Sequence, residues 1–226
     1  MATIAIGARH RAWRHPEWPW VALVVAAWAV IVAGGTAGGH RHGLGFASWT
    51  LMVVAMMLPA TIGVLRAISF DSMWGRRYRS PSLFLAAYLA AWAALGTVAL
   101  AAWQLAGMLG AAPHGAASTG AILLVAASWQ LSPTHRRCLK RCHRALPLGA
   151  RGRAADRACL RYGLFHARWC AGACWPLMLA MVPGHGLALM VALTALSTWQ
   201  RLARRPRRSL CAGALVALAT GVVLAG

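Results

Sequence analysis

Long apolar runs, separated by short basic segments, constrain the fold of this 226-residue chain more than any other feature. A helix that spans a bilayer needs about 20 mostly apolar residues. Seven runs meet or approach that length, at about 18–39, 44–65, 82–110, 116–133, 162–182, 186–200 and 209–226. The pattern predicts an all-α fold, a polytopic transmembrane helix bundle of about seven spans.

The charge balance argues strongly against a soluble globular enzyme. The chain has 23 Lys and Arg against 3 Asp and Glu, and only 12% of its residues are charged, whereas a soluble domain carries roughly a quarter. The three acids, Glu17, Asp71 and Asp156, lie far apart in the sequence. The sequence therefore does not favour catalysis by a pair of carboxylates.

The fifth and sixth runs need to be separated, because Trp169 to Gln200 is one uncharged stretch. It is long for one span and short for two. Pro183-Gly184-His185-Gly186 lies inside it, and Pro and Gly together mark turns. We therefore place the break there and begin the fifth helix earlier, with the Arg168 side chain reaching toward the surface.

The distribution of basic residues predicts the orientation, since Lys and Arg gather in cytoplasmic loops. With a cytoplasmic N-terminus, nearly all of the bases fall in inner segments at 1–17, 66–79, about 134–161 and 201–208. We expect a basic cytoplasmic N-terminal segment at 1–17, then a single transmembrane helical domain at 18–226 with a long basic cytoplasmic loop at about 134–161. The C-terminus is then outside.

The predicted location is the bacterial inner (plasma) membrane, as a multi-pass protein. The expected partners are the lipid bilayer and its anionic headgroups, which attract bases near the surface. A membrane protein partner or a homo-oligomer is a further expectation. Nucleic acid is not expected, because the bases are spread over separate segments and no nucleic-acid motif is present.

Cysteine spacing points to a metal or redox role on the cytoplasmic side, where thiols are normally reduced. The six cysteines are Cys138, Cys142, Cys159, Cys170, Cys174 and Cys211. The pairs 138/142 and 170/174 are each spaced to share one helix face. Facing each other, they would give four thiolates to one ion, as in structural zinc sites. Cu(I) also accepts thiolates, usually fewer. The alternative is that they are small buried hydrophobic residues.

The fifth helix also carries a line of soft ligands. At about 100° per residue, Cys170, Cys174, Met178, Met181 and His185 fall within an arc of about 80°. Thiolate, thioether and imidazole groups suit copper and other soft ions. The face is therefore a candidate path for an ion, with methionine packing as the alternative.

Other soft ligands lie outside this face. Met52, Met56 and Met57 lie on the second helix, which Pro59 is placed to bend. Histidines at the predicted outer ends are His40, His42, His114 and His185. His166 precedes Cys170 by one helical turn, so it is either a further ligand or a hydrogen-bonded structural residue.

Several short motifs follow one another between about residues 45 and 200. They are Trp49-x-x-Met52-x-x-Ala55-Met56-Met57-Leu58-Pro59, Tyr88-x-x-x-Trp92, Trp129-Gln130-Leu131-Ser132-Pro133, Cys138-x-x-x-Cys142, and Gly163-x-x-His166 with Cys170-x-Gly172-x-Cys174-Trp175 and Met178. On these motifs the chain resembles a bacterial family of predicted metal-binding integral membrane proteins, domain-of-unknown-function family 2182. The resemblance implies a helical membrane protein that holds a metal through these cysteines, with no established reaction. The chain departs from the family at Ala173, where a cysteine is usual, and at Gln200-Arg201, where an acidic residue and Lys are frequent.

These observations predict a membrane protein that binds, and moves or delivers, a soft metal ion, copper or zinc. Its cysteine cluster would lie at the cytoplasmic ends of the fourth and fifth helices. The candidate ligands are Cys138, Cys142, Cys170, Cys174, Met178, Met181, His166 and Met56. The alternative is a non-enzymatic structural partner or assembly factor of another membrane complex, with these residues as packing. No enzymatic activity is expected, although thiol redox chemistry stays open.

Overall fold

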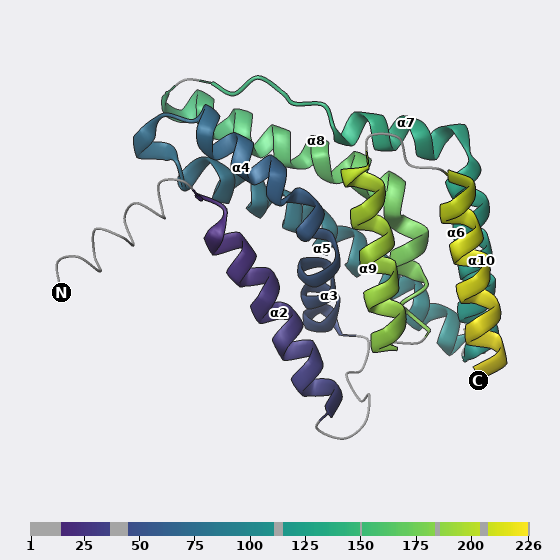
Figure 1. Ribbon diagram of the computed structural model, residues 1–226. Helices are drawn as coiled ribbons and strands as arrows, with labels where there is room; N and C mark the ends of the chain where they lie inside the picture. Colours follow the sequence, from purple (N-terminus) through teal and green to yellow (C-terminus); the bar gives the residue numbers. More distant parts are fainter. Residues whose placement is uncertain are drawn as a thin grey trace, which may run out of the picture.

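The computed structural model describes residues 15–36, 45–110, 115–149, 151–183, 186–203 and 208–225. Over these ranges the chain is helical and has no strand (Figure 1), so the prediction of an all-α fold is confirmed. The elements are α2 (Trp18–Thr36), α3 (Phe46–Met57), η1 (Pro59–Thr61), α4 (Ile62–Asp71), η2 (Trp74–Arg76), α5 (Arg79–Met108), α6 (Ala116–Leu131), α7 (Pro133–Cys142), α8 (Gly152–Leu179), α9 (Leu187–Leu202) and α10 (Arg208–Ala225).

Each of the seven apolar runs coincides with a helix or a bent pair of helices, but the number of membrane spans stays a prediction. Among the residues described, one segment, Trp74–Met108, is both long and apolar enough to cross a membrane. The bent pair Phe46–Met57 and Pro59–Asp71 would be a second if it forms one span. The basic N-terminal segment lies mostly outside the described residues.

Two predicted breaks in the helices are found. The uncharged stretch from Trp169 to Gln200 forms two helices, because α8 ends at Leu179 and α9 begins at Leu187. Pro59 interrupts the second run, where α3 and the segment after it differ in direction by 47°. Proline has no N–H to continue a helix, and the Thr61 hydroxyl donates to the Leu58 carbonyl at 2.8 Å.

The segment predicted as a long loop at about 134–161 is largely helical. Helix α7 begins where the Ser132 hydroxyl accepts a hydrogen bond from the His135 amide at 3.0 Å, with Pro133 in the first turn; both are N-terminal helix signals. Helix α8 begins at Gly152, well before the expected start at 162. The many Arg residues mark this stretch as polar, and polarity alone does not prevent a helix from forming.

Helices α5 and α8 pack closely against each other in the centre of the bundle. At Gly163 of α8, an added Cβ would lie 2.3 Å from the Phe84 carbonyl oxygen of α5, so only glycine permits this approach. Helix α3 also packs on α5, where the Trp49 indole donates to the Trp92 carbonyl at 3.0 Å. Helices α3, α5, α8 and α9 thereby enclose a buried layer rich in sulfur.

Helix α7 and the first half of α8 lie across one end of the bundle (Figure 1). Asp156 of α8 pairs there with Arg76 and, at 2.8 Å, with Arg79 at the start of α5. Hydrogen bonds from these two guanidinium groups hold the pKa of the Asp156 carboxyl below its usual value. The Arg141 guanidinium of α7 lies 4.4 Å from the centre of the Trp169 ring, which attracts cations. These contacts fasten the basic end of the molecule to α5 and α8.

Candidate metal centre

Cys170 and Cys174 form a buried pair of thiols on α8. Both residues are buried, with exposed fractions of 0% and 3%, and one nitrogen atom, Nη2 of Arg201, lies within 3.2 Å of both sulfurs. Residues four apart on a helix lie on one face, so the predicted pairing of these two cysteines agrees with the structure. The pair has a fixed spacing because both sulfurs belong to one unbroken helix.

The guanidinium group of Arg201, in the last turn of α9, lies against this pair. Its Nη2 donates to the Cys170 sulfur at 2.7 Å and to the Cys174 sulfur at 3.2 Å. Arg201 is 8% exposed, and its Nε and Nη1 atoms are buried without a hydrogen-bond partner. The distribution of basic residues predicts a cytoplasmic loop at 201–208 that includes Arg201, and it predicts no role for this residue at the site.

A signal for this position does exist in α9. Met190, Leu193, Ser197 and Arg201 follow one another at steps of three, four and four, and all four are buried. That spacing keeps them on one face of a helix. The inward face of α9 therefore carries a cation at its end.

Tyr88 and His166 form the aromatic side of the site. The Tyr88 hydroxyl of α5 lies 3.0 Å from the Cys170 sulfur. The His166 ring, one turn before Cys170, packs among the rings of Phe84, Tyr88 and Tyr162, with centroid distances of 5.6, 5.8 and 6.4 Å. His166 thus lies beside the thiol pair, and its role as a ligand stays a prediction.

Helix α7 brings the other two predicted cysteines to α8. Cys142 is buried near Cys170 and Arg201, and burial raises the pKa of its thiol to about 12. Cys138 lies over Gly172, where an added Cβ would be 2.9 Å from the Cys138 sulfur. His143 ties α7 to the end of α9, because its Nε2 donates to the Arg201 carbonyl at 2.8 Å.

A four-thiolate centre is not assembled in this conformation. Within the ranges that the structure describes, no three Cys, His, Asp or Glu side chains are grouped closely enough to hold a metal ion. The close pair is Cys170 with Cys174, and a cation rather than further thiols lies against it. The assignment of metal ligands therefore stays a prediction.

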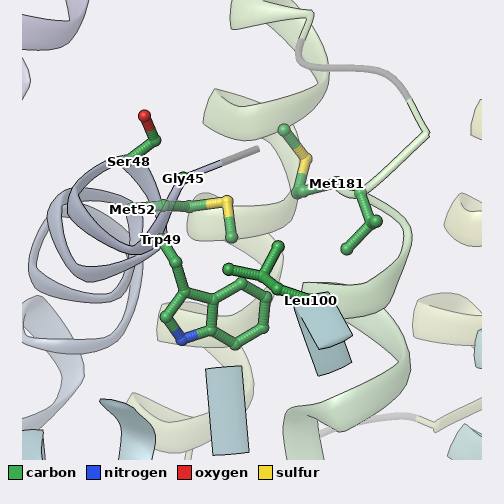
Figure 2. A pocket seen from close by; sticks show the side chains of 7 residues that line it. Gly45, Ser48, Trp49, Met52, Leu100 and Met181 are labelled. Atoms are coloured by element: carbon green, nitrogen blue, oxygen red, sulfur yellow. The ribbon is translucent and has the colours of Figure 1, made fainter. Parts of the chain in front are cut away.

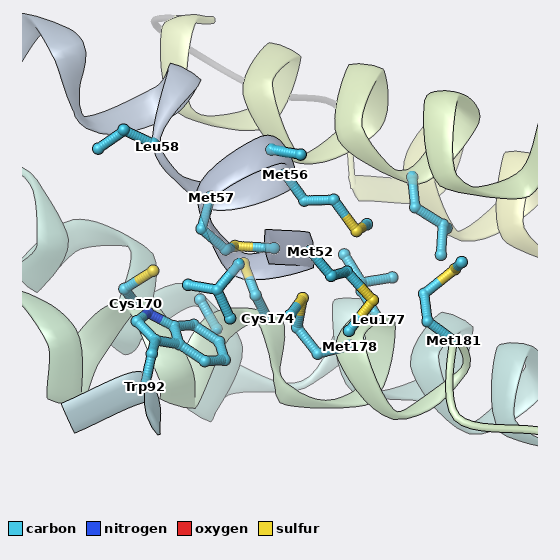
Figure 3. Packing of buried hydrophobic residues seen from close by; sticks show 14 of the residues in the cluster. Met52, Met56, Met57, Leu58, Trp92, Cys170, Cys174, Leu177, Met178 and Met181 are labelled. Carbon is cyan, nitrogen blue, oxygen red and sulfur yellow. The ribbon is translucent and has the colours of Figure 1, made fainter. Parts of the chain in front are cut away.

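Buried methionines continue from the thiol pair in one layer. Figure 3 shows Cys170 at one end of this layer, Cys174 between Met57 and Met178, and Met181 at the other end. The methionines are Met52, Met56 and Met57 of α3, with Met178 and Met181 from the α8 segment. Met181 lies in the turn after α8, although its amide still donates to the Met178 carbonyl at 3.2 Å. The predicted helical face thus ends at Met178. His40, His42, His114 and His185 lie outside the described residues.

Two cavities border this methionine layer. A small one, shown in Figure 2, is lined by Met52 and Met181 together with Trp49. A larger, almost wholly apolar cavity of about 430 Å³ lies between α5 and α8 and is lined by Met178. Met52, Met178 and Met181 therefore border these cavities, although all five methionines are buried.

Comparison with known proteins gives one family match. A family model described as PpoB2, copper chaperone, matches residues 46–224, a range that includes every residue of the thiol pair, the Arg201 contact and the methionine layer. No curated protein and no solved structure matches the chain.

Proposed function

Because the chain belongs to the PpoB2 copper chaperone family, we propose that it binds Cu(I) at Cys170 and Cys174 and delivers it to a partner protein. The observation that carries this proposal is the buried thiol pair beside a layer of buried methionines. The match to this family supports the metal binding that the resemblance to family 2182 implies, although the two families carry different names.

Copper fits this site better than zinc. Thiolate and thioether sulfur select Cu(I), whereas a structural zinc site closes a tetrahedron of four ligands. The described residues offer two thiols in close contact, with Cys142 nearby as a third. Bound thiols must lose their protons, so copper loading releases protons and weakens as the pH falls.

The methionine layer supplies a route to the thiols. Met52 and Met181 line a cavity at the end of the layer far from the cysteines (Figure 2), and Met178 lies one turn from Cys174. A neutral thioether holds a cation less tightly than an anionic thiolate does. An ion that enters at Met52 and Met181 would therefore gain affinity when it passes from Met178 to Cys174.

The proposed location is the bacterial inner membrane, with seven spans and the thiol pair near the cytoplasmic face. The seven apolar helical segments and the concentration of bases around α7 and the start of α8 support it. Anionic headgroups would bind the basic end. Cargo taken up through the methionine layer would then reach the thiols from the outer side.

Metal analysis of detergent-purified protein loaded with Cu(I) under anaerobic conditions tests the function. We expect about one copper per chain in the wild type, since one thiol pair suits one Cu(I) ion. The double variant Cys170→Ser, Cys174→Ser should lose it. Cys159→Ser is the matched control, because Cys159 is a buried thiol on the same helix beside Ser80, away from the pair.

Unchanged copper in the double variant would overturn the assignment of these two ligands. No copper in either protein, with both equally stable, would instead favour the alternative of a structural partner or assembly factor. In that case the cysteines and methionines are packing residues, and co-purification would be the next measurement.

A further inference from the structure

The buried guanidinium of Arg201 needs a negative charge that the three acidic side chains, Glu17, Asp71 and Asp156, do not supply. Arginine stays charged in proteins, and a buried charge is costly unless it is paired. Two of the three acids are engaged elsewhere, since Glu17 pairs with Arg66 and Asp156 with Arg76 and Arg79. The third, Asp71, ends α4 near Tyr162.

The groups around Arg201 are weak acids that become anionic only on losing a proton. They are the thiols of Cys170 and Cys174, at 2.7 and 3.2 Å from its Nη2, and the hydroxyl of Tyr88, which lies 3.0 Å from the Cys170 sulfur. Two of the guanidinium nitrogens, Nε and Nη1, are buried without an acceptor. Both facts indicate a site whose charge is balanced when an anion forms beside Arg201.

The charge of the bound ion decides whether this balance is reached. A monovalent ion on the thiolates of Cys170 and Cys174 leaves one net negative charge, which the guanidinium cancels. A divalent ion on the same two thiolates leaves no net charge, so Arg201 remains unpaired in a buried place. In such surroundings charge interactions are much stronger than in water.

We infer that Arg201 is a specificity-determining residue that makes the thiol pair select a monovalent soft cation, Cu(I), over divalent ions such as Zn²⁺. This inference rests on the proposed function. Arg201 acts without binding the ion, because a guanidinium has no free electron pair to offer. It also holds the two sulfurs, since one nitrogen donates to both.

Competition with chelators measures this selectivity in the purified protein. Cu(I) affinity is measured against bicinchoninate, and Zn²⁺ affinity against a fluorescent zinc chelator, for the wild type, Arg201→Gln and Arg201→Lys. Loss of a unit charge within a few ångströms predicts that Arg201→Gln lowers Cu(I) affinity by at least about tenfold. Zn²⁺ affinity should stay the same or rise. Arg201→Lys keeps the charge and should retain most of the preference for Cu(I).

Arg141→Gln is the matched control. It removes an arginine of α7 that lies over Trp169 rather than over the thiol pair, and it should leave the ratio of the two affinities unchanged. Equal ratios in Arg201→Gln and wild type would overturn the inference while the proposed function stands. Failure of the wild type to bind Cu(I) would instead reject the proposed function.

A measurement on the wild type alone avoids any variant that fails to fold. Ag(I) and Cd(II) are both soft ions that bind thiolates, and they differ in charge. Ag(I) should displace Cu(I) from the protein, whereas Cd(II) at the same concentration should not. Equal displacement by Cd(II) would contradict a selection based on charge.

Discussion

Met178 lies between the buried thiol of Cys174 and the buried side chain of Met181 (Figure 3). It follows Cys174 by one turn of α8, it is buried, and it lines the cavity of about 430 Å³ between α5 and α8. Its side chain has one of two roles: it only fills space in the core, or its sulfur also binds an ion that then passes to the Cys174 thiol. Leucine has nearly the same volume and lacks the sulfur, so one substitution separates the two roles.

Met178→Leu should leave the amount of bound copper unchanged and slow its transfer to an acceptor chelator several-fold. Stability should change by less than about 1.5 kcal/mol, because the swap conserves volume. Stopped-flow transfer from copper-loaded protein measures the rate. Met190→Leu is the control, since Met190 is buried in α9 and lines neither cavity. Equal rates in the two variants would make Met178 a packing residue.

Arg201 is the residue that sequence reasoning missed. The spacing of Cys170 and Cys174 was enough to place them on one face, because both belong to one helix. Arg201 comes from another helix. Because basic residues gather in cytoplasmic loops, the sequence predicts that Arg201 belongs to the loop at 201–208. The spacing of Met190, Leu193, Ser197 and Arg201 puts the guanidinium on one helix face, and the burial of that face shows that it turns inward.

Helix α8 is the element on which the site depends. It carries the thiol pair, it begins outside the predicted span at Gly152, and it contacts α5, α6 and α7. Its approach to α5 is closest at Gly163, opposite the Phe84 carbonyl. A backbone carbonyl cannot move aside as the end of a flexible side chain can, so a methyl group there pushes the two helices apart.

Gly163→Ala should destabilise the protein by about 1–3 kcal/mol, the usual cost of overpacking. Gly213→Ala is the matched control on α10, because an added Cβ there meets no atom within 4 Å. At that open position alanine should stabilise the helix by up to about 1 kcal/mol. Thermal unfolding of both variants in detergent gives the comparison. A Gly163 variant as stable as the Gly213 variant would show that α5 and α8 can separate without cost.

Apolar length and turn residues were sufficient to predict most helices. The break between α8 and α9 followed from the Pro and Gly residues around 183–186, and the bend after α3 followed from Pro59. The start of α8 could not be found in this way, because apolar content stops at the expected membrane edge whereas the hydrogen-bonded helix continues to Gly152. The contact of Cys138 of α7 with Gly172 of α8 is likewise not revealed by any periodicity.

The molecule as a whole is polar at one end and apolar over most of its length. The basic residues of α7 and of the first turns of α8 lie across one end of the helices (Figure 1). Such an arrangement suits a bundle whose charged end faces the cytoplasm. An odd number of spans puts the two termini on opposite sides of the membrane, and an even number puts them on the same side.

Reporter fusions test the predicted topology of the whole chain. Seven spans with a cytoplasmic N-terminus predict that alkaline phosphatase joined after residue 226 is active and that a fluorescent protein joined there is dark. Fusions ending in the segment between α9 and α10 should give the opposite pair of signals. An inactive phosphatase at the C-terminus would indicate an even number of spans.

The contact of Arg201 with Cys170 and Cys174 also has a consequence for the order of synthesis. The ribosome makes the two thiols first and the guanidinium 31 and 27 residues later, respectively. During that interval α8 exists without its counter-cation, so the nascent chain lacks the charge balance that favours Cu(I). The site is complete only after α9 has been inserted. Under the proposed function, copper capture would therefore be delayed until little more than α10 remains to be made, and an unfinished chain would not hold a reactive ion.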